Sequence, residues 1–173
     1  PCTIESVHAA SHARAAGMSL ETAARDLRYD FLERTAQTTE CRVIALAHNA
    51  DDQVETVLLS VIRGAGPDGL QGMPFVRGNI VRPMLREPRR AIEEYLRMRG
   101  LQARTDHTNL HPTCTRNKVR LQLLPMLRAE FNPSVDEALL RTAELVAADS
   151  AYLKVTVGEL ETELLFTEDG NVC

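Results

Sequence analysis

A short apolar run, residues 42–47, is followed closely by an amphipathic helical pattern from Asp51, and this pairing limits the possible folds most. The run contains the β-branched pair Val43-Ile44 and lies between two helical patterns, as buried strands of parallel sheets do. The apolar residues that recur on one face of the following helix are Val54, Val57, Leu58, Val61 and Ile62. The glycine-rich stretch after Arg63 is expected to end that helix. Strand followed by helix predicts an α/β domain built on a parallel sheet.

The rest of the sequence continues this pattern and then becomes helical. Ser19 precedes an apolar stripe at helical spacing, which predicts a helix over 19–38 with Ser19 as its cap. The alternation of residues 3–7 indicates a short half-buried strand. The remaining expected elements are a strand at 79–82, helices at 88–99 and 117–128, an extended polar segment at 101–111, and a long acidic stretch at 134–163 forming two helices or one with a bend. We therefore expect an α/β domain over residues 1–129 and a helical segment over 130–173 that begins a further domain.

The charge of the chain is distributed unevenly. The net charge is −4, but residues 77–128 carry twelve basic and four acidic side chains, whereas residues 130–173 carry two basic and ten acidic ones. Eighteen of the twenty basic residues are arginines, whose planar guanidinium groups bind phosphate oxygens and stack on bases. The central basic block therefore indicates either a surface for a polyanion such as nucleic acid or simply a solvated surface.

Membrane and cysteine patterns narrow the class of protein. No apolar run approaches the roughly 18–20 residues that a membrane-spanning helix needs, and no secretory signal is visible. The four cysteines are far apart and form no Cys-x-x-Cys pair. This argues against a zinc ribbon or a disulfide scaffold and suits a reducing compartment. We therefore expect a cytoplasmic protein that does not associate with membranes.

Polar side chains follow residues 42–47 directly, at the edge of a parallel sheet where ligands usually bind. His48 and Asp51 come first. At about 100° per residue, the polar residues that share one arc of the following helix are Asp52, Glu55, Thr56 and Arg63. Carboxylates there can hold Mg²⁺ with a nucleotide, bind an ammonium group or accept a proton from an amine. A structural interpretation is also open, because acids in a first turn cap helices and a single histidine at a strand end is usually structural.

The sequence Ala-His-x-x-Asp-Asp-x-x-Glu-Thr (residues 47–56), followed by Arg-Gly-x-Gly (63–66), resembles the second signature of the PP-loop ATP pyrophosphatases that modify tRNA. Within them the chain resembles the tRNA(Ile)-lysidine synthetases. The shorter markers, in order, are Leu20-Glu21, Ala24-Arg25, Arg28-Tyr29, Gly69-Leu70, Met73, Arg82-Pro83, Asp106, Asn109, Arg116-Asn117, Arg120, Leu124-Pro125 and Asn132-Pro133. Asn49 stands where that family often has a second histidine. The family's ATP-gripping loop, Ser-Gly-Gly-x-Asp-Ser, is absent, and we expect it to belong upstream of Pro1.

This resemblance implies a fold and a reaction. The fold would be a partial Rossmann-like sheet of the adenine nucleotide alpha hydrolase type, followed by a helical part. The family uses ATP to adenylate the C2 oxygen of the wobble cytidine of a minor isoleucine tRNA, releasing pyrophosphate. The lysine ε-amine then attacks C2 and AMP leaves. The implied cofactors are ATP and Mg²⁺, and the implied partners are tRNA(Ile) and lysine.

The resemblance also implies roles for individual residues. The candidate catalytic residues, which would hold the lysine amine or touch the reacting base, are His48, Asp52 and Glu55. The candidate ATP-binding residues are Arg25, His48, Asp51 and Arg63. The candidate RNA-binding residues are Arg82, Arg116, Asn117 and Arg120. No residue is assigned as a metal ligand. The alternative for Arg25 is a solvated helix face, and for Arg82 and Arg120 it is a structural salt bridge.

Other functions remain open at this point. One is tRNA 2-thiolation by the same ATP chemistry, although the scattered cysteines supply no cluster ligands. Another is a non-catalytic RNA-binding remnant. We expect the chain by itself to be inactive, and we allow for a homodimer.

Overall fold

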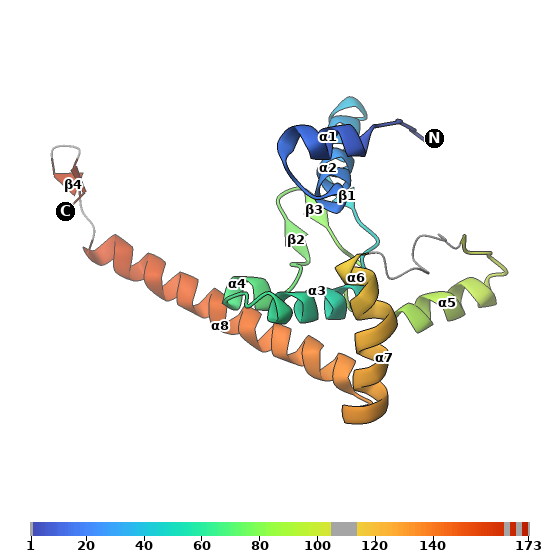
Figure 1. Cartoon of the computed structure of the whole chain (residues 1–173). Coiled ribbons are helices and arrows are strands. Elements are labelled where there is room, and N and C mark those ends of the chain that lie inside the picture. Colours follow the sequence, from blue (N-terminus) through green and yellow to red (C-terminus); the bar gives the residue numbers. More distant parts are fainter. Residues whose placement is uncertain (1, 105–113, 165–166, 169–170, 173) are drawn as a thin grey trace. The chain divides into compact units, whose positions relative to one another are not determined.

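The computed structural model describes residues 2–104, 114–164, 167–168 and 171–172 (Figure 1). The chain forms two compact units. The first comprises residues 1–46 and 75–83, and the second comprises residues 47–74 and 84–173. The family markers Asp106 and Asn109, and most of the segment expected to be extended at 101–111, lie outside the described residues. None of the helices in the described part of the chain is long and apolar enough to cross a membrane.

The first unit is a small α/β assembly. Its helices are α1 (Ala9–Ala16) and α2 (Leu20–Thr38), and its strands are β1 (Ile44–Ala45), β2 (Val76–Arg77) and β3 (Ile80–Val81). In the order β1-β3-β2, β1 pairs in parallel with β3, and β2 pairs antiparallel with β3. The two parallel strands place Ile44 beside Ile80, and both pack with Ala36 of α2 in the core. The parallel sheet and the α/β class are therefore confirmed.

Two expectations about this unit need correction. Residues 3–7 form no strand: the segment has no regular structure and its side chains are exposed. The apolar–polar alternation of Thr3–Val7 predicted a strand, but no neighbouring strand pairs with this segment in the described part of the chain. The run at 42–47 is a strand over only Ile44 and Ala45, and Val43 is 54% exposed. By contrast, α2 begins as predicted, because the Ser19 side chain accepts the Thr22 backbone N–H.

The second unit is mostly helical. Its elements are α3 (Ala50–Ile62), α4 (Pro67–Leu70), α5 (Arg89–Met98), a helical run from Thr115 to Phe131, and α8 (Val135–Leu164). The run comprises α6 (Thr115–Lys118), a π-helical turn at Val119–Leu123, α7 (Leu124–Met126) and a second π-helical turn at Leu127–Phe131. Pro125 lies between the two wide turns, where its missing N–H removes a regular helical hydrogen bond. A short antiparallel pair, β4 (Thr167–Glu168) and β5 (Asn171–Val172), ends the unit.

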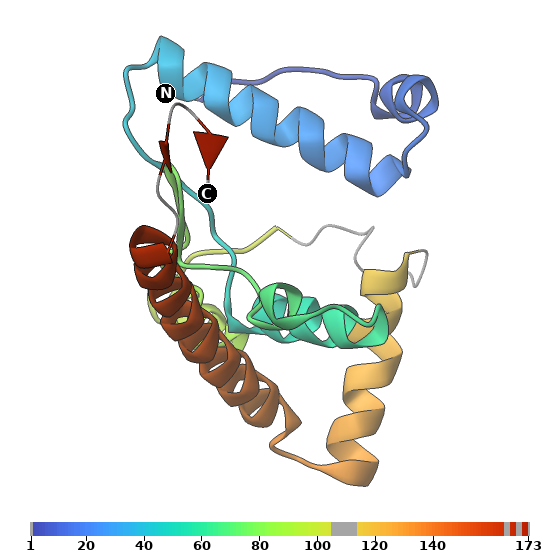
Figure 2. The same cartoon turned by 90° about the vertical axis from the view of Figure 1, so that its left-hand side faces the viewer.

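The helices predicted for this unit are confirmed at nearly the expected residues. Arg63 ends α3 and Gly64 follows with a φ of 69°, a left-handed conformation that glycine adopts readily. Pro88 precedes α5 and Gly100 follows it. The acidic stretch forms one long helix, α8, rather than two (Figure 2). The predicted domain boundary between residues 129 and 130 stays a prediction.

The core of the second unit lies where α3, the Thr115–Phe131 run and α8 meet. Its buried side chains are Val54, Leu58, Leu59, Val119 and Leu124, with Leu123, Leu127, Leu139 and Leu140 packed against them. Val61 and Ile62, which the helical periodicity placed on the same face, are more than half exposed. The buried face of α3 therefore extends from Ala50 to Leu59, and this fixes the orientation of its polar residues.

Candidate functional site

The start of α3 is fixed by a reciprocal cap. Asn49 is the N-cap residue, and its side-chain oxygen accepts the backbone N–H of Asp52 at 3.0 Å. In return, Oδ2 of Asp52 accepts the backbone N–H of Asn49 at 3.1 Å. The structural interpretation, in which an acid of the first turn caps the helix, therefore holds for Asp52. The N-cap residue itself is Asn49, which the sequence analysis had noted only as a departure from the family pattern. The cap engages one oxygen of Asp52 and leaves Oδ1 for another partner.

One turn further along α3, Glu55 receives two arginines. Its side chain is only 2% exposed. Nε of Arg116 donates to Oε2 at 2.7 Å. Arg120 donates through Nε to Oε1 and through Nη2 to Oε2, the latter at 3.0 Å. Both oxygens of a nearly buried carboxylate therefore accept charge-assisted hydrogen bonds.

The same two arginines also reach Asp52. Nη2 of Arg116 lies 3.1 Å from Oδ1 of Asp52, and Nη2 of Arg120 lies 3.4 Å from it. The acids are three residues apart on α3, and the arginines are four residues apart on the Thr115–Phe131 run, so each pair shares a helical face. We call Asp52, Glu55, Arg116 and Arg120 the carboxylate–arginine cluster. It holds two negative and two positive charges.

Burial and charge act together on Arg120. Burial by itself disfavours the charged guanidinium, but the hydrogen bonds to Glu55 and the nearby charges of Asp52 and Asp51 outweigh it, so the pKa of Arg120 is raised above its ordinary value. The arginine side chains keep about a quarter of their surface exposed, 25% for Arg116 and 26% for Arg120. The cluster is therefore charge-balanced: Glu55 is covered, whereas Asp52, at 21% exposed, and both arginines reach the surface.

The structure thus brings four of the predicted site residues together and shows how they pair. Arg116 and Arg120 were expected to contact RNA, and Asp52 and Glu55 to handle an amine. The structure shows the arginines hydrogen bonded to the acids, which is the structural salt bridge considered for Arg120. The RNA-binding and catalytic roles of these residues stay predictions.

Other predicted residues lie close by or farther along the same helix. Asp51 accepts the backbone N–H of Arg89 at 2.8 Å and so joins the start of α5 to α3. His48 is half-buried just before the cap, and Asn117, 8% exposed, follows Arg116. Arg63 is exposed at the opposite end of α3, about 12 Å along the helix from Glu55 at 1.5 Å per residue. The roles predicted for these four residues also stay predictions.

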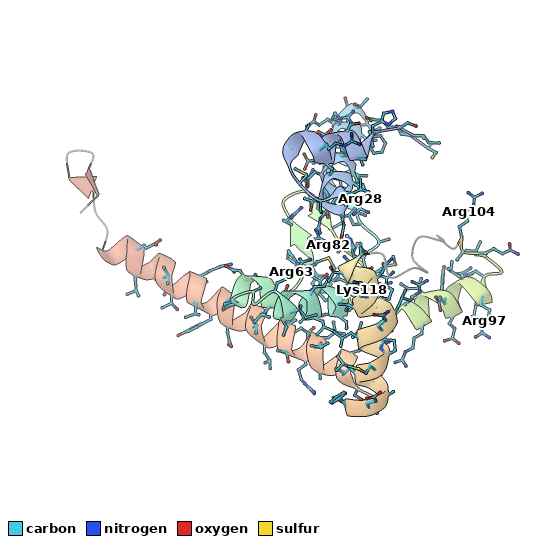
Figure 3. All side chains as sticks on the ribbon, in the orientation of Figure 1. Arg28, Arg63, Arg82, Arg97, Arg104 and Lys118 are labelled. Atoms are coloured by element: carbon cyan, nitrogen blue, oxygen red, sulfur yellow. The ribbon has the colours of Figure 1, made fainter. Side chains whose placement is uncertain are left out.

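The remaining predicted residues, Arg25 and Arg82, gather around Tyr29 in the first unit. The guanidinium carbons of Arg25, Arg28 and Arg77 lie 5.6, 5.8 and 5.4 Å from the Tyr29 ring centroid. Arg82, only 2% exposed, lies beside the same tyrosine. Figure 3 labels Arg28 on α2 and Arg82 just after β3. We call these five residues the Tyr29 cluster.

The Tyr29 cluster affects the tyrosine and was only partly predictable. Burial raises the pKa of Tyr29, but the neighbouring guanidinium groups of Arg82 and Arg25 outweigh burial and lower it below its ordinary value. Sequence reasoning missed Tyr29 and Arg77 as site residues. The spacing of Arg25 and Tyr29, four residues apart on one helix, was a usable signal. No local pattern points to Arg77, because β2 follows α2 by almost forty residues.

The chain was compared with known proteins. The PP-loop domain family matches residues 1–127. A tRNA(Ile)-lysidine synthase of Clostridioides difficile is 38% identical over 170 residues, which cover 98% of this chain and 36% of that protein. A tRNA(Ile)-lysidine synthase of Geobacter sulfurreducens is 44% identical over 156 residues, which cover 88% of this chain and 33% of that protein. The chain spans about a third of the length of these curated relatives.

A solved structure supports the fold. The U34-tRNA thiolase NcsA from Methanococcus maripaludis, determined with its [4Fe-4S] cluster, aligns with a TM-score of 0.53 at 18% identity. The alignment covers 72% of this chain and 43% of that one. At this identity the likeness concerns the fold alone. Since the family match covers well over half of the sequence and includes the carboxylate–arginine cluster, the chain belongs to the PP-loop domain family.

Proposed function

We propose that the protein modifies tRNA with ATP, joining lysine to C2 of the wobble cytidine of an isoleucine tRNA. The observation that carries this proposal is the 38–44% identity to proteins named tRNA(Ile)-lysidine synthase along most of the chain. The fold likeness to a thiolase adds nothing for sulfur transfer. The four cysteines are far apart in the sequence and form no Cys-x-x-Cys pair for a cluster, so tRNA 2-thiolation remains the less supported alternative.

The reaction places two demands on the residues of the chain. ATP adenylates the C2 oxygen of cytidine with release of pyrophosphate, and the lysine ε-amine then attacks C2 and displaces AMP. The amine must be held near the base and must lose a proton. Asp52 and Glu55 are proposed to hold it, since a carboxylate binds an ammonium group and accepts a proton from an amine.

The hydrogen bonds of the carboxylate–arginine cluster suggest how the roles are linked. The lone pairs that would receive a proton on Glu55 already accept hydrogen bonds from Arg116 and Arg120. The same guanidinium groups reach the surface, and arginine binds phosphate as readily as carboxylate. We therefore propose that RNA phosphates draw the arginines away from Asp52 and Glu55, so that the acids become available to the amine when the tRNA is bound.

Magnesium fits these residues poorly. No group of three or more histidine, cysteine or acidic side chains in the described part of the chain could hold a metal ion. Asp52 and Glu55, the acids best placed to do so, face two guanidinium groups. The ATP-binding roles of Arg25, His48, Asp51 and Arg63, the cytoplasmic location and the homodimer remain proposals.

The direct test is an assay of lysine transfer. The protein expressed from its complete reading frame is incubated with ATP, radiolabelled lysine and an isoleucine tRNA transcript that carries cytidine at the wobble position. We expect ATP-dependent incorporation of lysine, with release of AMP and pyrophosphate. A transcript with uridine at that position serves as the control and should accept no lysine. Sulfur incorporation in place of lysine, or AMP release without any tRNA product, would refute the proposal.

A further inference from the structure

Three arginines of the Tyr29 cluster, Arg25, Arg28 and Arg77, are exposed. Within the part of the chain that the structure describes, Arg25, Arg28 and Arg77 form no ion pair. Arg34, on the same helix, is bound to both Glu5 and Asp30 at 3.0 Å. Arginines gathered around one ring repel one another unless an anion lies among them. The cluster is therefore suited to an anionic ligand that has several oxygens.

The tyrosine ring gives these arginines a common anchor. A guanidinium near the face of an aromatic ring is held by the ring's quadrupole, and the contacts come from two separate segments, α2 and β2. Long arginine side chains lose rotamer freedom when they bind a ligand. Arginines already held against a ring lose less of this freedom, so Tyr29 pre-organises the group for binding.

We propose that the three exposed arginines of the Tyr29 cluster bind phosphate groups of an RNA backbone, with Tyr29 as the residue that positions their guanidinium groups. Phosphate is the anion that matches the planar fork of arginine. The choice of RNA as the source of the phosphate rests on the proposed function, since tRNA is the polyanion that this function requires. This site includes Arg25, which was expected to bind ATP, whereas Arg82, expected to bind RNA, is only 2% exposed and lies beside Tyr29.

The site is tested by measuring how the binding of tRNA to the full chain depends on salt concentration. The variants are Arg28→Gln and Arg77→Gln, and the matched control is Arg14→Gln, an exposed helical arginine of the same unit. Each phosphate contact that is lost should lower the slope of log affinity against log salt by about 1. We expect this decrease in both cluster variants and no change in Arg14→Gln. Unchanged slopes in both cluster variants would overturn the site.

The positioning role of Tyr29 is tested by two substitutions. Tyr29→Phe keeps the aromatic face and should bind tRNA with nearly the original affinity. Tyr29→Leu removes that face and should weaken binding by about 3–10-fold, as expected for the loss of exposed cation–π contacts. Thermal unfolding of each variant shows whether the fold is retained. If Tyr29→Leu does not fold, the salt dependence of Arg28→Gln and Arg77→Gln decides whether the site binds RNA. Equal affinities of folded Phe and Leu variants would overturn the role of Tyr29.

Two further measurements distinguish RNA phosphate from free polyphosphate as the ligand, and the binding site from the proposed function. If the arginine variants bind inorganic pyrophosphate more weakly but keep the RNA slope, the site serves free polyphosphate and the RNA assignment is wrong. The binding assays contain neither ATP nor lysine. A protein that forms no lysidine but shows the predicted slopes would thus refute the proposed function and leave the site intact.

Discussion

At the scale of the residue, Glu55 shows how a buried charge limits what a side chain can do. It is 1% exposed as a residue and accepts hydrogen bonds from two arginines of another helix. Burying a charged carboxylate destabilises the folded state unless its charged partners stay in place. The same acid is proposed to receive an amine, which requires those partners to move. Its stabilising and catalytic contributions can therefore be separated by substitution.

We predict that Glu55→Ala lowers both stability and activity. Two guanidinium groups would lose their main partner, which should reduce the free energy of unfolding by about 3–5 kcal/mol. Lysine incorporation should fall by about 10²–10⁴, the usual effect of losing a general base. Urea unfolding and the lysine transfer assay measure the two effects. Glu55→Gln keeps the side-chain volume and should recover part of the stability but not the activity. Activity near the original level in a folded variant would remove Glu55 from the mechanism.

Tyr29 offers a second test at this scale, through its titration. Since its pKa is lowered in the folded chain, the folded state favours the phenolate relative to the unfolded state. This contribution to stability is absent below the folded pKa, grows as the pH rises through it, and is complete above the unfolded value of about 10. The phenolate absorbance that Tyr29→Phe removes from the native chain should titrate below the ordinary tyrosine value of about 10. Titration of that absorbance at or above the ordinary value would contradict this prediction.

At the scale of the element, the loop after α3 is held by one glutamine. The buried Gln53 side chain donates to the carbonyl of Met73 at 3.0 Å and accepts its backbone N–H at 2.8 Å. Gly72, with a φ of 71°, lies so close that an added Cβ would be 2.7 Å from Gln53 Nε2. Because Gln53 lies between Asp52 and Glu55 in sequence, this contact also fixes the helix that carries the candidate site.

We expect Gln53→Ala to destabilise the chain by about 2–4 kcal/mol, because two buried backbone groups of Met73 lose the side-chain partner that Gln53 provides. Urea unfolding of the full chain measures the change. Gln71→Ala is the matched control: its side chain bonds to the exposed Asp68, and a surface change of this kind stays within about 0.5 kcal/mol. Equal effects of the two substitutions would mean that the Gln53 contact does not hold the loop.

At the scale of the whole molecule, the basic centre and the acidic end meet in ion pairs along α8. The acidic helix α8 forms ion pairs with Arg86 through Glu144 at 3.3 Å, with Asp68 through Lys154 at 3.1 Å and, in its first turn, with Arg128 through Asp136 at 2.8 Å. The side chains of the first two pairs are more than 60% exposed, and exposed pairs contribute about 0–1 kcal/mol. The buried residue Ala143, 2% exposed, marks the apolar face that packs on α3 and α4.

We predict that apolar packing, rather than charge, holds α8 in place. Glu144→Gln should change the free energy of unfolding by less than about 1 kcal/mol. Ala143→Asp, at the adjacent position, should lower it by about 3–5 kcal/mol, because it buries an unpaired charge. Chemical denaturation at low and high salt measures both effects. A large loss of stability in Glu144→Gln that disappears at high salt would show instead that the ion pairs dominate.

Local signals explain why much of the fold was predictable. Ser19 and Gly100 each determine a helix end through their own backbone or side-chain geometry, and the structure has helix ends at both. The same reasoning failed for residues 3–7, because alternation indicates a strand only where a partner strand is available. It also overlooked Asn49 as the cap of α3, since the two neighbouring acids offered a competing cap.

The sequence by itself determined the longer helices, the parallel sheet and the family, and it supplied the candidate site residues, because these depend on short spacings and on ordered motifs; it missed α1 and α4. Only the tertiary structure decided the partners. Glu55 meets Arg116 and Arg120 across 61 and 65 residues, and Arg77 reaches the ring of Tyr29 from another segment. Such contacts depend on how whole elements pack, and packing depends on burial summed over many side chains rather than on any local pattern.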